Sequence, residues 1–219
     1  MKLLHWETLK TDKRIPRSTE EKTVDALKGI ETFGAPKVEI IMVSHQWLRP
    51  SLNKDEANPD TVDNLKALSL NEFSDWRRNW VMRNHGFHPE IFYWIDFSCL
   101  DQNKPDIGVP LLPLWVACCE RFLMINTPAY NERAWCRLEP LLSHVFSFAD
   151  HLNSIDLDFK SKWPLSGIEK FTTLLDPIKG KTTDPKDISL IKDLVEITIN
   201  SQSTSKSEFN ITRIKTFHL

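Results

Sequence analysis

The stretch "KVEIIMVSHQW" (Lys37–Trp47) is an apolar, β-branched run that ends in polar and aromatic residues. A short run of this composition is typical of a buried strand. Within it, "KVEIIMV" (37–43) has the length of a strand, and the segment that follows, "SHQWLRPSLNKDEANPDT" (44–61), is rich in Pro, Asn and Asp, which predicts a long loop. The sequence therefore predicts a buried strand followed directly by a long loop that begins with "SHQW".

Two further apolar runs of strand length follow, "EIFYWIDF" (90–97) and "RFLMIN" (121–126). Segments with helical patterns separate the runs or flank them, at residues 23–34, 61–83, 111–120 and from "TPAYNE" to about residue 148. Alternation of strand and helix predicts a parallel sheet with helices on both faces. The strands are almost wholly apolar, as expected for strands that are covered on both sides.

Size and composition limit the classes of protein. A chain of 219 residues, with 41% hydrophobic and 26% charged residues, fits one ordered globular domain. The formal net charge of −2 gives no electrostatic case for nucleic acid or an anionic membrane as a partner. "MKLLHWETLKTDKR" (1–14) does not have the pattern of a signal peptide, and no run reaches the roughly 18 apolar residues of a membrane helix.

The cysteines and histidines give no case for a metal site. The four cysteines form no C-x-x-C pair, so we expect reduced thiols in a cytoplasmic protein. His85 and His88 lack a nearby set of cysteines or carboxylates that would complete four-coordination. We therefore expect no bound metal.

The two ends of the chain are less clearly patterned than the middle. Residues 1–22 are charged and predict an N-terminal extension, on the surface or partly disordered. Residues 23–219 are expected to form one domain with its core at 36–148. Within 149–219, "PKDISLIKDLVEITI" (185–199) predicts a helix, "GIEKFTTLLDP" (167–177) a helix or a strand turn, and "SEFNITRIKTFHL" (207–219) an edge strand.

Three segments in this order resemble the successive motifs of TIR-type domains. They are "VSHQW" (43–47), "WIDFSCLDQ" (94–102) and "INTPAYNERAWCRLEPLL" (125–142). The first two are also similar to the fungal heterokaryon-incompatibility domain, which is itself considered TIR-like. The resemblance covers about residues 36–148. Pro140 departs from the pattern, because an aliphatic residue usually follows the glutamate of the third motif.

The resemblance implies a flavodoxin-like three-layer α/β sandwich with a central parallel sheet of strand order 2-1-3-4-5. In open sheets of this kind, ligands bind beyond the carboxyl ends of the strands, where the winding reverses. That point lies between the first and third strands. The three motifs are therefore expected to meet in one crevice.

The resemblance also implies hydrolysis of NAD⁺ at the nicotinamide–ribose bond, with Glu139 as the catalytic residue and NAD⁺ as substrate rather than cofactor. A fixed carboxylate can stabilise the ribosyl oxocarbenium ion that forms. Trp47 and Trp135 are expected to stack on the ligand, and Arg49 and Arg133 to bind the pyrophosphate. Polar contacts at the strand ends are expected from Ser44, His45 and Asp96.

Each assignment has a structural alternative. Glu139 can pair with Arg133 or Arg137 on a helix surface, and tryptophans more often pack than bind ligands. Ser44 can end its strand by bonding the backbone, and Asp96 can cap its loop. Cys136 is expected to pack. Pro140, inside a helix, removes one backbone hydrogen bond and can redirect the carboxylate before it.

Fold does not determine function, so other functions stay open. The main alternative is a non-catalytic TIR-like adaptor that signals by homotypic association. A third is a relative that cleaves nucleosides. We expect the enzyme to act in a stress, immune or self-recognition pathway, and for the enzyme and the adaptor alike we expect a homo-oligomer.

Overall fold

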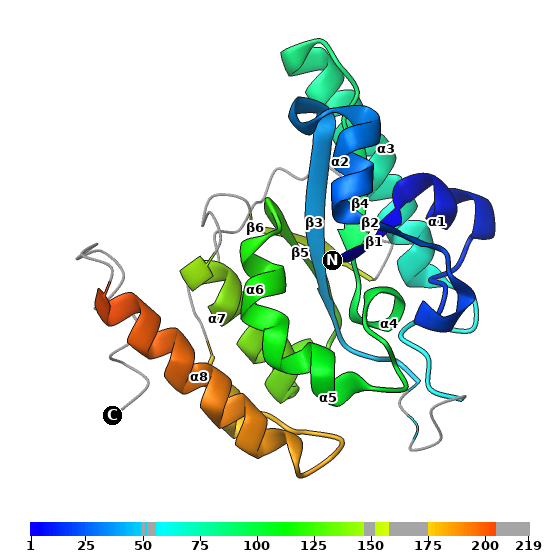
Figure 1. The fold of residues 1–219 in the computed structure, drawn as a ribbon. Helices are drawn as coiled ribbons and strands as arrows, with labels where there is room; N and C mark the ends of the chain where they lie inside the picture. Colours follow the sequence, from blue (N-terminus) through cyan, green and yellow to red (C-terminus); the bar gives the residue numbers. More distant parts are fainter. Residues whose placement is uncertain (50, 52–55, 147–151, 158–174, 205–219) are drawn as a thin grey trace.

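Figure 1 shows the computed structural model, which describes residues 1–49, 51, 56–146, 152–157 and 175–204. Six strands and eight α-helices are described in these ranges. In chain order the elements are β1 (Lys2–His5), α1 (Trp6–Asp12), β2 (Thr23–Asp25), α2 (Ala26–Phe33), β3 (Val38–His45), α3 (Leu65–His85), β4 (Glu90–Trp94), α4 (Asp96–Cys99), α5 (Pro105–Gly108), α6 (Leu112–Ala117), β5 (Arg121–Asn126), α7 (Ala134–Phe146), β6 (Leu152–Asp156) and α8 (Asp187–Thr204). Short 3₁₀ turns join several of them, among them η3 (Val109–Leu111), η4 (Tyr130–Glu132) and η6 (Pro177–Lys179).

The strands form one mixed sheet in the order β2-β1-β4-β3-β5-β6. β4, β3, β5 and β6 are parallel, whereas β1 pairs antiparallel with both β4 and β2. The predicted α/β class is confirmed. The wholly parallel sheet of order 2-1-3-4-5 is wrong, because two N-terminal strands extend the sheet beyond β4. The parallel part alone runs second, first, third, fourth, so its winding reverses at β3.

The expectation of a surface extension at residues 1–22 is also wrong. Leu4 and His5 pair with Tyr93 and Phe92 of β4, inside the sheet. The adjacent residues Leu3 and Leu4 are both fully buried, because successive side chains of a strand point to opposite faces and each face has its own core. A four-residue strand is too short to show a periodic pattern, which explains why the sequence did not reveal it.

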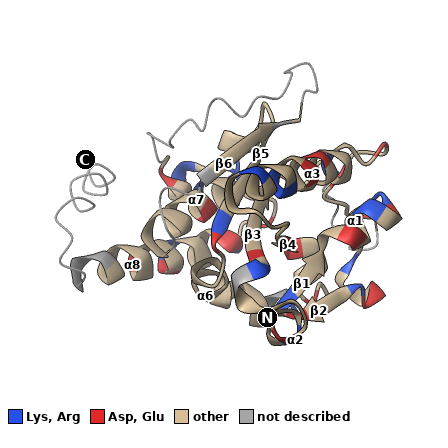
Figure 2. Ribbon diagram, turned by 90° about the horizontal axis from the view of Figure 1, so that it is seen from above, with Lys and Arg blue, Asp and Glu red and all other residues tan. Residues whose placement is uncertain are grey.

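Helices cover both faces of the sheet and produce three layers, which Figure 2 shows from above. Side chains of α1 and α3 pack on one face, where Leu9, Leu70 and Phe73 meet Ile41 and other strand residues. Side chains of α6 and α7 pack on the opposite face, and α8 lies against α7. The alternation of β3 therefore divides its side chains between the two cores.

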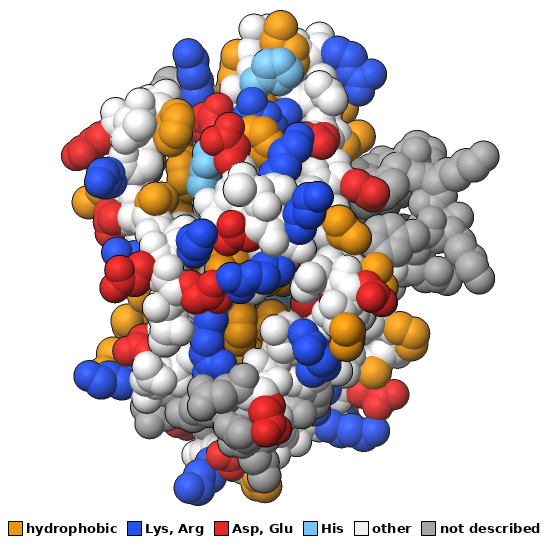
Figure 3. Space-filling view, turned by 90° about the vertical axis from the view of Figure 1, so that its right-hand side faces the viewer, with side chains coloured by type: hydrophobic (Ala, Val, Ile, Leu, Met, Phe, Trp, Pro, Cys, Tyr) orange, Lys and Arg blue, Asp and Glu red, His pale blue; other side chains and the backbone are white. Residues whose placement is uncertain are grey.

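The predicted C-terminal helix is confirmed as α8, whereas the predicted edge strand at 207–219 and most of the segment 167–177 lie outside the described residues. No helix within the described ranges has the length and apolarity needed to cross a bilayer. Figure 3 shows the side on which α1 lies, where acidic and basic side chains are interspersed over the described surface.

Candidate functional site

The last two residues of β3 direct their side chains to opposite faces of the sheet. Met42 packs in the core beneath α7, and Ser44, two residues further, lies on the same side. Val43 packs in the core beneath α3, and His45 reaches Lys66 of α3. The carboxyl end of β3 therefore carries two polar groups that different helices contact.

On the α7 side, Glu139 points inward to the end of β3. The hydroxyl of Ser44 donates a hydrogen bond to Oε2 of Glu139, and the Tyr130 hydroxyl contacts the same Ser44 oxygen. Ser44 and Tyr130 are fully buried, and Glu139 is partly buried. Burial raises the pKa of Glu139 to about 8, with the hydrogen bond from Ser44 opposing the shift and the charge of Asp96 adding to it.

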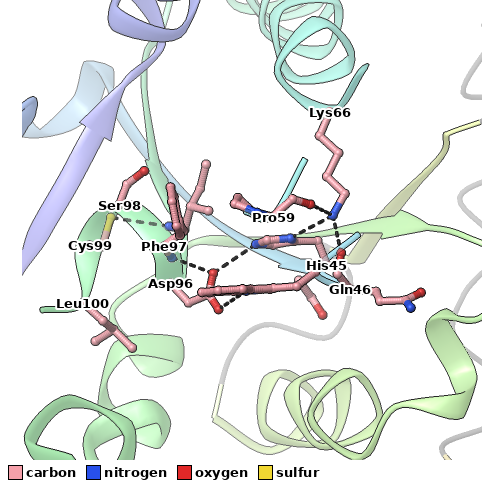
Figure 4. Close-up of polar contacts among 12 residues, drawn as sticks. His45, Gln46, Pro59, Lys66, Asp96, Phe97, Ser98, Cys99 and Leu100 are labelled. Carbon is pink, nitrogen blue, oxygen red and sulfur yellow. Dashed lines mark hydrogen bonds and ion pairs between the residues drawn. The ribbon is translucent and has the colours of Figure 1, made fainter. Parts of the chain in front are cut away.

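On the α3 side, His45 lies between a lysine and a carboxylate (Figure 4). Its Nδ1 is 3.0 Å from Nζ of Lys66, and its Nε2 is 3.1 Å from Oδ1 of Asp96. Burial and the neighbouring ammonium lower the pKa of His45. Burial lowers the pKa of Lys66 to about 8, opposed by the charges of Asp60 and Asp96. His45 is therefore neutral in this arrangement.

The contacts from Lys66 to His45 to Asp96 form a chain of polar groups, and Asp96, just after β4, is its end nearest the protein surface. Its Oδ1 accepts from the backbone N–H of Phe97 at 2.6 Å and its Oδ2 from the indole N–H of Trp47 at 2.8 Å. Trp47 also packs edge-on against Phe97, with ring centroids 5.4 Å apart. Burial works to raise the pKa of Asp96, but His45 and the hydrogen bonds from Trp47 and Phe97 outweigh it and lower the pKa.

Ser44, His45, Asp96 and Glu139 thus gather at the carboxyl ends of β3, β4 and β5, where the winding of the parallel strands reverses. Comparison with protein-family models, curated proteins and solved structures gives no match. The functional argument therefore depends on the geometry of this chain. Two carboxyl groups with pKa values shifted in opposite directions at one such edge are a recognised feature of sites for acid–base and glycosyl chemistry.

Two of the predicted ligand contacts, Trp135 and Arg133, are engaged elsewhere. The indole N–H of Trp135 donates to Oδ2 of Asp187 at 2.8 Å, and Arg133 donates to Thr183. The segment before α8 lies across the first turn of α7, and a Cβ at Gly180 would come within 2.5 Å of the Ala134 backbone. This close approach draws the side chains at the start of α7 toward the C-terminal segment.

Arg49 is exposed and donates from Nε to the carbonyl oxygen of Asp60 at 2.9 Å. That bond stabilises the loop between β3 and α3. The predicted backbone role of Ser44 is replaced by side-chain contacts, whereas the capping role of Asp96 is present together with its contacts to His45 and Trp47.

The sequence reasoning missed Lys66 and Tyr130. Lys66 lies four, seven and eleven residues before Leu70, Phe73 and Arg77, which are all buried, so a lysine on the inward face of a helix was the available signal. Tyr130 gave no comparable signal.

Cys136 is buried and burial raises the pKa of its thiol, consistent with the predicted packing role. Within the described ranges, no group of three or more His, Cys, Asp or Glu side chains is arranged to hold a metal ion.

Proposed function

We propose that this chain hydrolyses the nicotinamide–ribose bond of NAD⁺ or a related nucleotide, with Glu139 as the catalytic carboxyl group. The observation that supports this most directly is the position of Glu139. It points to the end of β3 at the reversal of the winding, where Ser44 holds it, and it forms no ion pair with the described basic residues. Glu139 does not pair with Arg137 on the helix surface, because Arg137 donates to the carbonyl oxygens of Asn131 and Asp176.

In the proposed reaction, the bond between ribose C1′ and the nicotinamide nitrogen breaks. Both electrons pass to the ring nitrogen, which neutralises the pyridinium, and the ribose becomes an oxocarbenium ion. Water then attacks C1′ and loses a proton. The carboxylate of Glu139 stabilises the positive charge on the sugar and accepts that proton, and Asp96 adds negative potential from the end of β4.

The raised pKa of Glu139 suits a cationic substrate. At neutral pH the free protein holds a proton on Glu139, because its pKa is about 8. A bound pyridinium favours the ionised carboxylate, so binding drives the proton off. The carboxylate then forms only where the positive charge that it stabilises is present.

The test incubates the purified full chain with NAD⁺, both at high protein concentration and after chemical cross-linking. Chromatography measures the nicotinamide that is released. Glu139→Gln and Glu139→Ala are expected to lower the rate by about 10²–10³-fold. Glu132→Gln is the matched control, because Glu132 is exposed and pairs with Lys181. The proposal is rejected if the assembled wild type releases no nicotinamide, or if the Glu139→Gln variant is as active as the wild type.

The alternative function, homotypic assembly without catalysis, draws support from a different surface. Ile107, Leu111 and Leu114 on α5, η3 and α6 are exposed by 68%, 41% and 53%. Three exposed aliphatic side chains on successive turns suit a contact with a second copy. Light scattering of the wild type and of Leu114→Asp tests this. A monomeric wild type, or a Leu114→Asp variant of unchanged mass, would contradict the adaptor proposal.

A further inference from the structure

Lys66 is a fully buried cation without a carboxylate in direct contact. Its Nζ donates to the carbonyl oxygen of Pro59 at 2.5 Å, to the carbonyl oxygen of Gln46 and to Nδ1 of His45 at 3.0 Å. None of the lysine ion pairs within the described residues includes it. A buried ammonium costs several kcal/mol of folding free energy unless its donors are satisfied. The three contacts of Lys66 satisfy its three N–H donors.

The position of Lys66 is fixed by the start of its helix. The carboxylate of Asp60 accepts from the backbone N–H groups of Lys66 and Ala67 at 2.8 and 2.9 Å. Asp60 thus caps α3 from the preceding loop, and it is itself buried. The lysine stem therefore enters the core with its ammonium directed at the end of β3, as Figure 4 shows.

Donor and acceptor counting assigns the tautomer of His45. An ammonium group has three donors and no acceptor, and carbonyl oxygens only accept. Its third N–H therefore goes to Nδ1 of His45, which must carry a lone pair. The imidazole proton is then on Nε2, where it donates to Oδ1 of Asp96.

The opposite tautomer would weaken the other end of the chain. A proton on Nδ1 would face the Lys66 ammonium, and the lone pair of Nε2 would face the Asp96 carboxylate. Both contacts would then be repulsive. The ammonium of Lys66 and the carboxylate of Asp96 are thus linked through one neutral imidazole, and the same carboxylate holds the indole of Trp47.

We propose that Lys66 is a positioning residue, which fixes His45 as the Nε2–H tautomer and thereby holds the Asp96 carboxylate and the Trp47 indole in place for the substrate. Its effect on turnover rests on the proposed function, whereas its effect on the tautomer does not. Asp96 is the accessible end of the chain, with 32% of its side chain exposed against 2% for His45. A substrate would meet Asp96 and Trp47, while Lys66 and His45 act from behind them.

The charged groups around His45 come from three segments. Lys66 faces it from α3, Asp96 from the start of α4, and Asp60 from the loop before α3. Removal of the lysine leaves two carboxylates near the imidazole. We therefore expect Lys66→Met to raise the pKa of His45, because burial then opposes the two carboxylates alone, and Nδ1 to gain a proton that neutralises the charge that Asp96 offers.

The experiment is nitrogen-15 NMR of the histidine side chains in the full chain, with a His45→Gln sample to assign the signal. In the wild type at neutral pH, Nε2 of His45 is expected to be protonated and Nδ1 unprotonated. Lys66→Met is expected to abolish this pattern, with Nδ1 becoming protonated, whereas Asp96→Asn is expected to keep it, because Lys66 sets the tautomer. Lys10→Met is the control, since Lys10 is an exposed lysine that pairs with Asp75.

A wild-type spectrum with the proton on Nδ1, or an imidazolium at neutral pH, overturns the proposal even if Lys66→Met does not fold. The reverse pattern, in which Asp96→Asn changes the tautomer and Lys66→Met does not, overturns it as well. In the NAD⁺ assay, Lys66→Met is expected to lower kcat/KM by about 10–100-fold and to add a histidine ionisation to the pH profile. If the wild type releases no nicotinamide, the proposed function fails, and the spectra still decide the role of Lys66 at His45.

Discussion

The two ends of the parallel strands both hold buried ionisable groups, but the partners of these groups differ. At the amino end, Glu39 of β3 accepts from Nε and Nη2 of Arg77 at 2.9 and 2.8 Å, and also from Arg121. A cavity of about 230 Å³ lies beside this cluster. At the carboxyl end, Glu139 is held by a hydroxyl group, and Lys66 by carbonyl oxygens and an imidazole.

The difference lies in whether each charge meets an opposite charge. Burial works to raise the pKa of Glu39, but Arg77 and Arg121 outweigh it and lower the pKa. Glu139 has no such partner among the described residues, and its pKa rises to about 8. The fold depends on a compensated carboxylate, because its removal leaves buried cations unpaired, whereas an uncompensated carboxylate reduces stability and is available for chemistry. We therefore propose a structural role for the charged cluster at the amino end and place the proposed function at the carboxyl end.

The largest expected effect is on stability at the amino end. Glu39→Gln leaves the guanidinium groups of Arg77 and Arg121 buried without their shared carboxylate. We expect the free energy of unfolding at neutral pH to fall by about 3–5 kcal/mol, measured by urea denaturation. Glu132→Gln, which breaks an exposed pair with Lys181, should cost less than about 1 kcal/mol. Equal losses in the two variants would remove the distinction between compensated and exposed charges.

The second effect is an opposite pH dependence of stability at the two ends. The raised pKa of Glu139 means that the folded state keeps a proton that the unfolded state releases above its ordinary pKa of 4.5. This contribution is complete below pH 4.5 and is lost as the pH rises to about 8, by at most about 1.4 kcal/mol per pH unit. The lowered pKa of Glu39 acts the other way, because its contribution is lost as the pH falls below 4.5.

Thermal unfolding of the wild type and of Glu139→Gln over this pH range measures the effect. The amide does not ionise, so the variant should gain stability relative to the wild type as the pH rises from about 5 to about 8. Well below pH 4.5 the difference in stability between the two proteins should no longer change with pH, because the carboxyl group is then protonated in both the folded and unfolded states. Parallel curves would show that Glu139 titrates normally, and the contrast between the two ends would be lost.

The comparison also shows what the sequence could reveal. The parallel strands could be predicted from the sequence, because burial on both faces makes them continuously apolar. The order of the motifs predicted that Ser44, Asp96 and Glu139 lie at one edge of the sheet. The antiparallel strand β1 could not be predicted, because its two leucines show no period and its partner residues Phe92 and Tyr93 in β4 lie 87 and 89 positions after His5 and Leu4.

Side-chain partners were harder to predict than strand ends. Arg133 and Trp135 looked like ligand contacts because they shortly precede the motif glutamate, but the segment 183–187, which ends at the first residue of α8, binds them. That segment is some 50 residues further along the chain, and local spacing carries no information about such a contact. Lys66 differs from these two residues, because its place on the inward face of α3 was a local signal that its ammonium is buried and contacts other side chains.

A third effect distinguishes the possible substrates of the carboxyl end. If Glu139 acts as a carboxylate on a cationic nicotinamide nucleotide, kcat/KM should rise about tenfold per pH unit below its pKa of about 8 and level off above it. A neutral nucleoside needs its leaving base protonated, so Glu139 would act as an acid and kcat/KM would fall above pH 8. The pH profile with NAD⁺ therefore checks the proposed chemistry, and a profile that falls with pH would favour the nucleoside.

The smallest effect comes from the hydroxyl group that holds Glu139. Ser44 donates to the carboxylate, and this hydrogen bond opposes the effect of burial on the pKa of Glu139. Ser44→Ala should therefore raise that pKa further and move the rising limb of the kcat/KM profile to higher pH, by less than about one unit for the loss of one hydrogen bond. Tyr130→Phe should move it less, because Tyr130 contacts Ser44 and not the carboxylate. A shift to lower pH in Ser44→Ala would mean that the serine stabilises the protonated acid, and the carboxyl end would then favour an acid at Glu139 over a carboxylate.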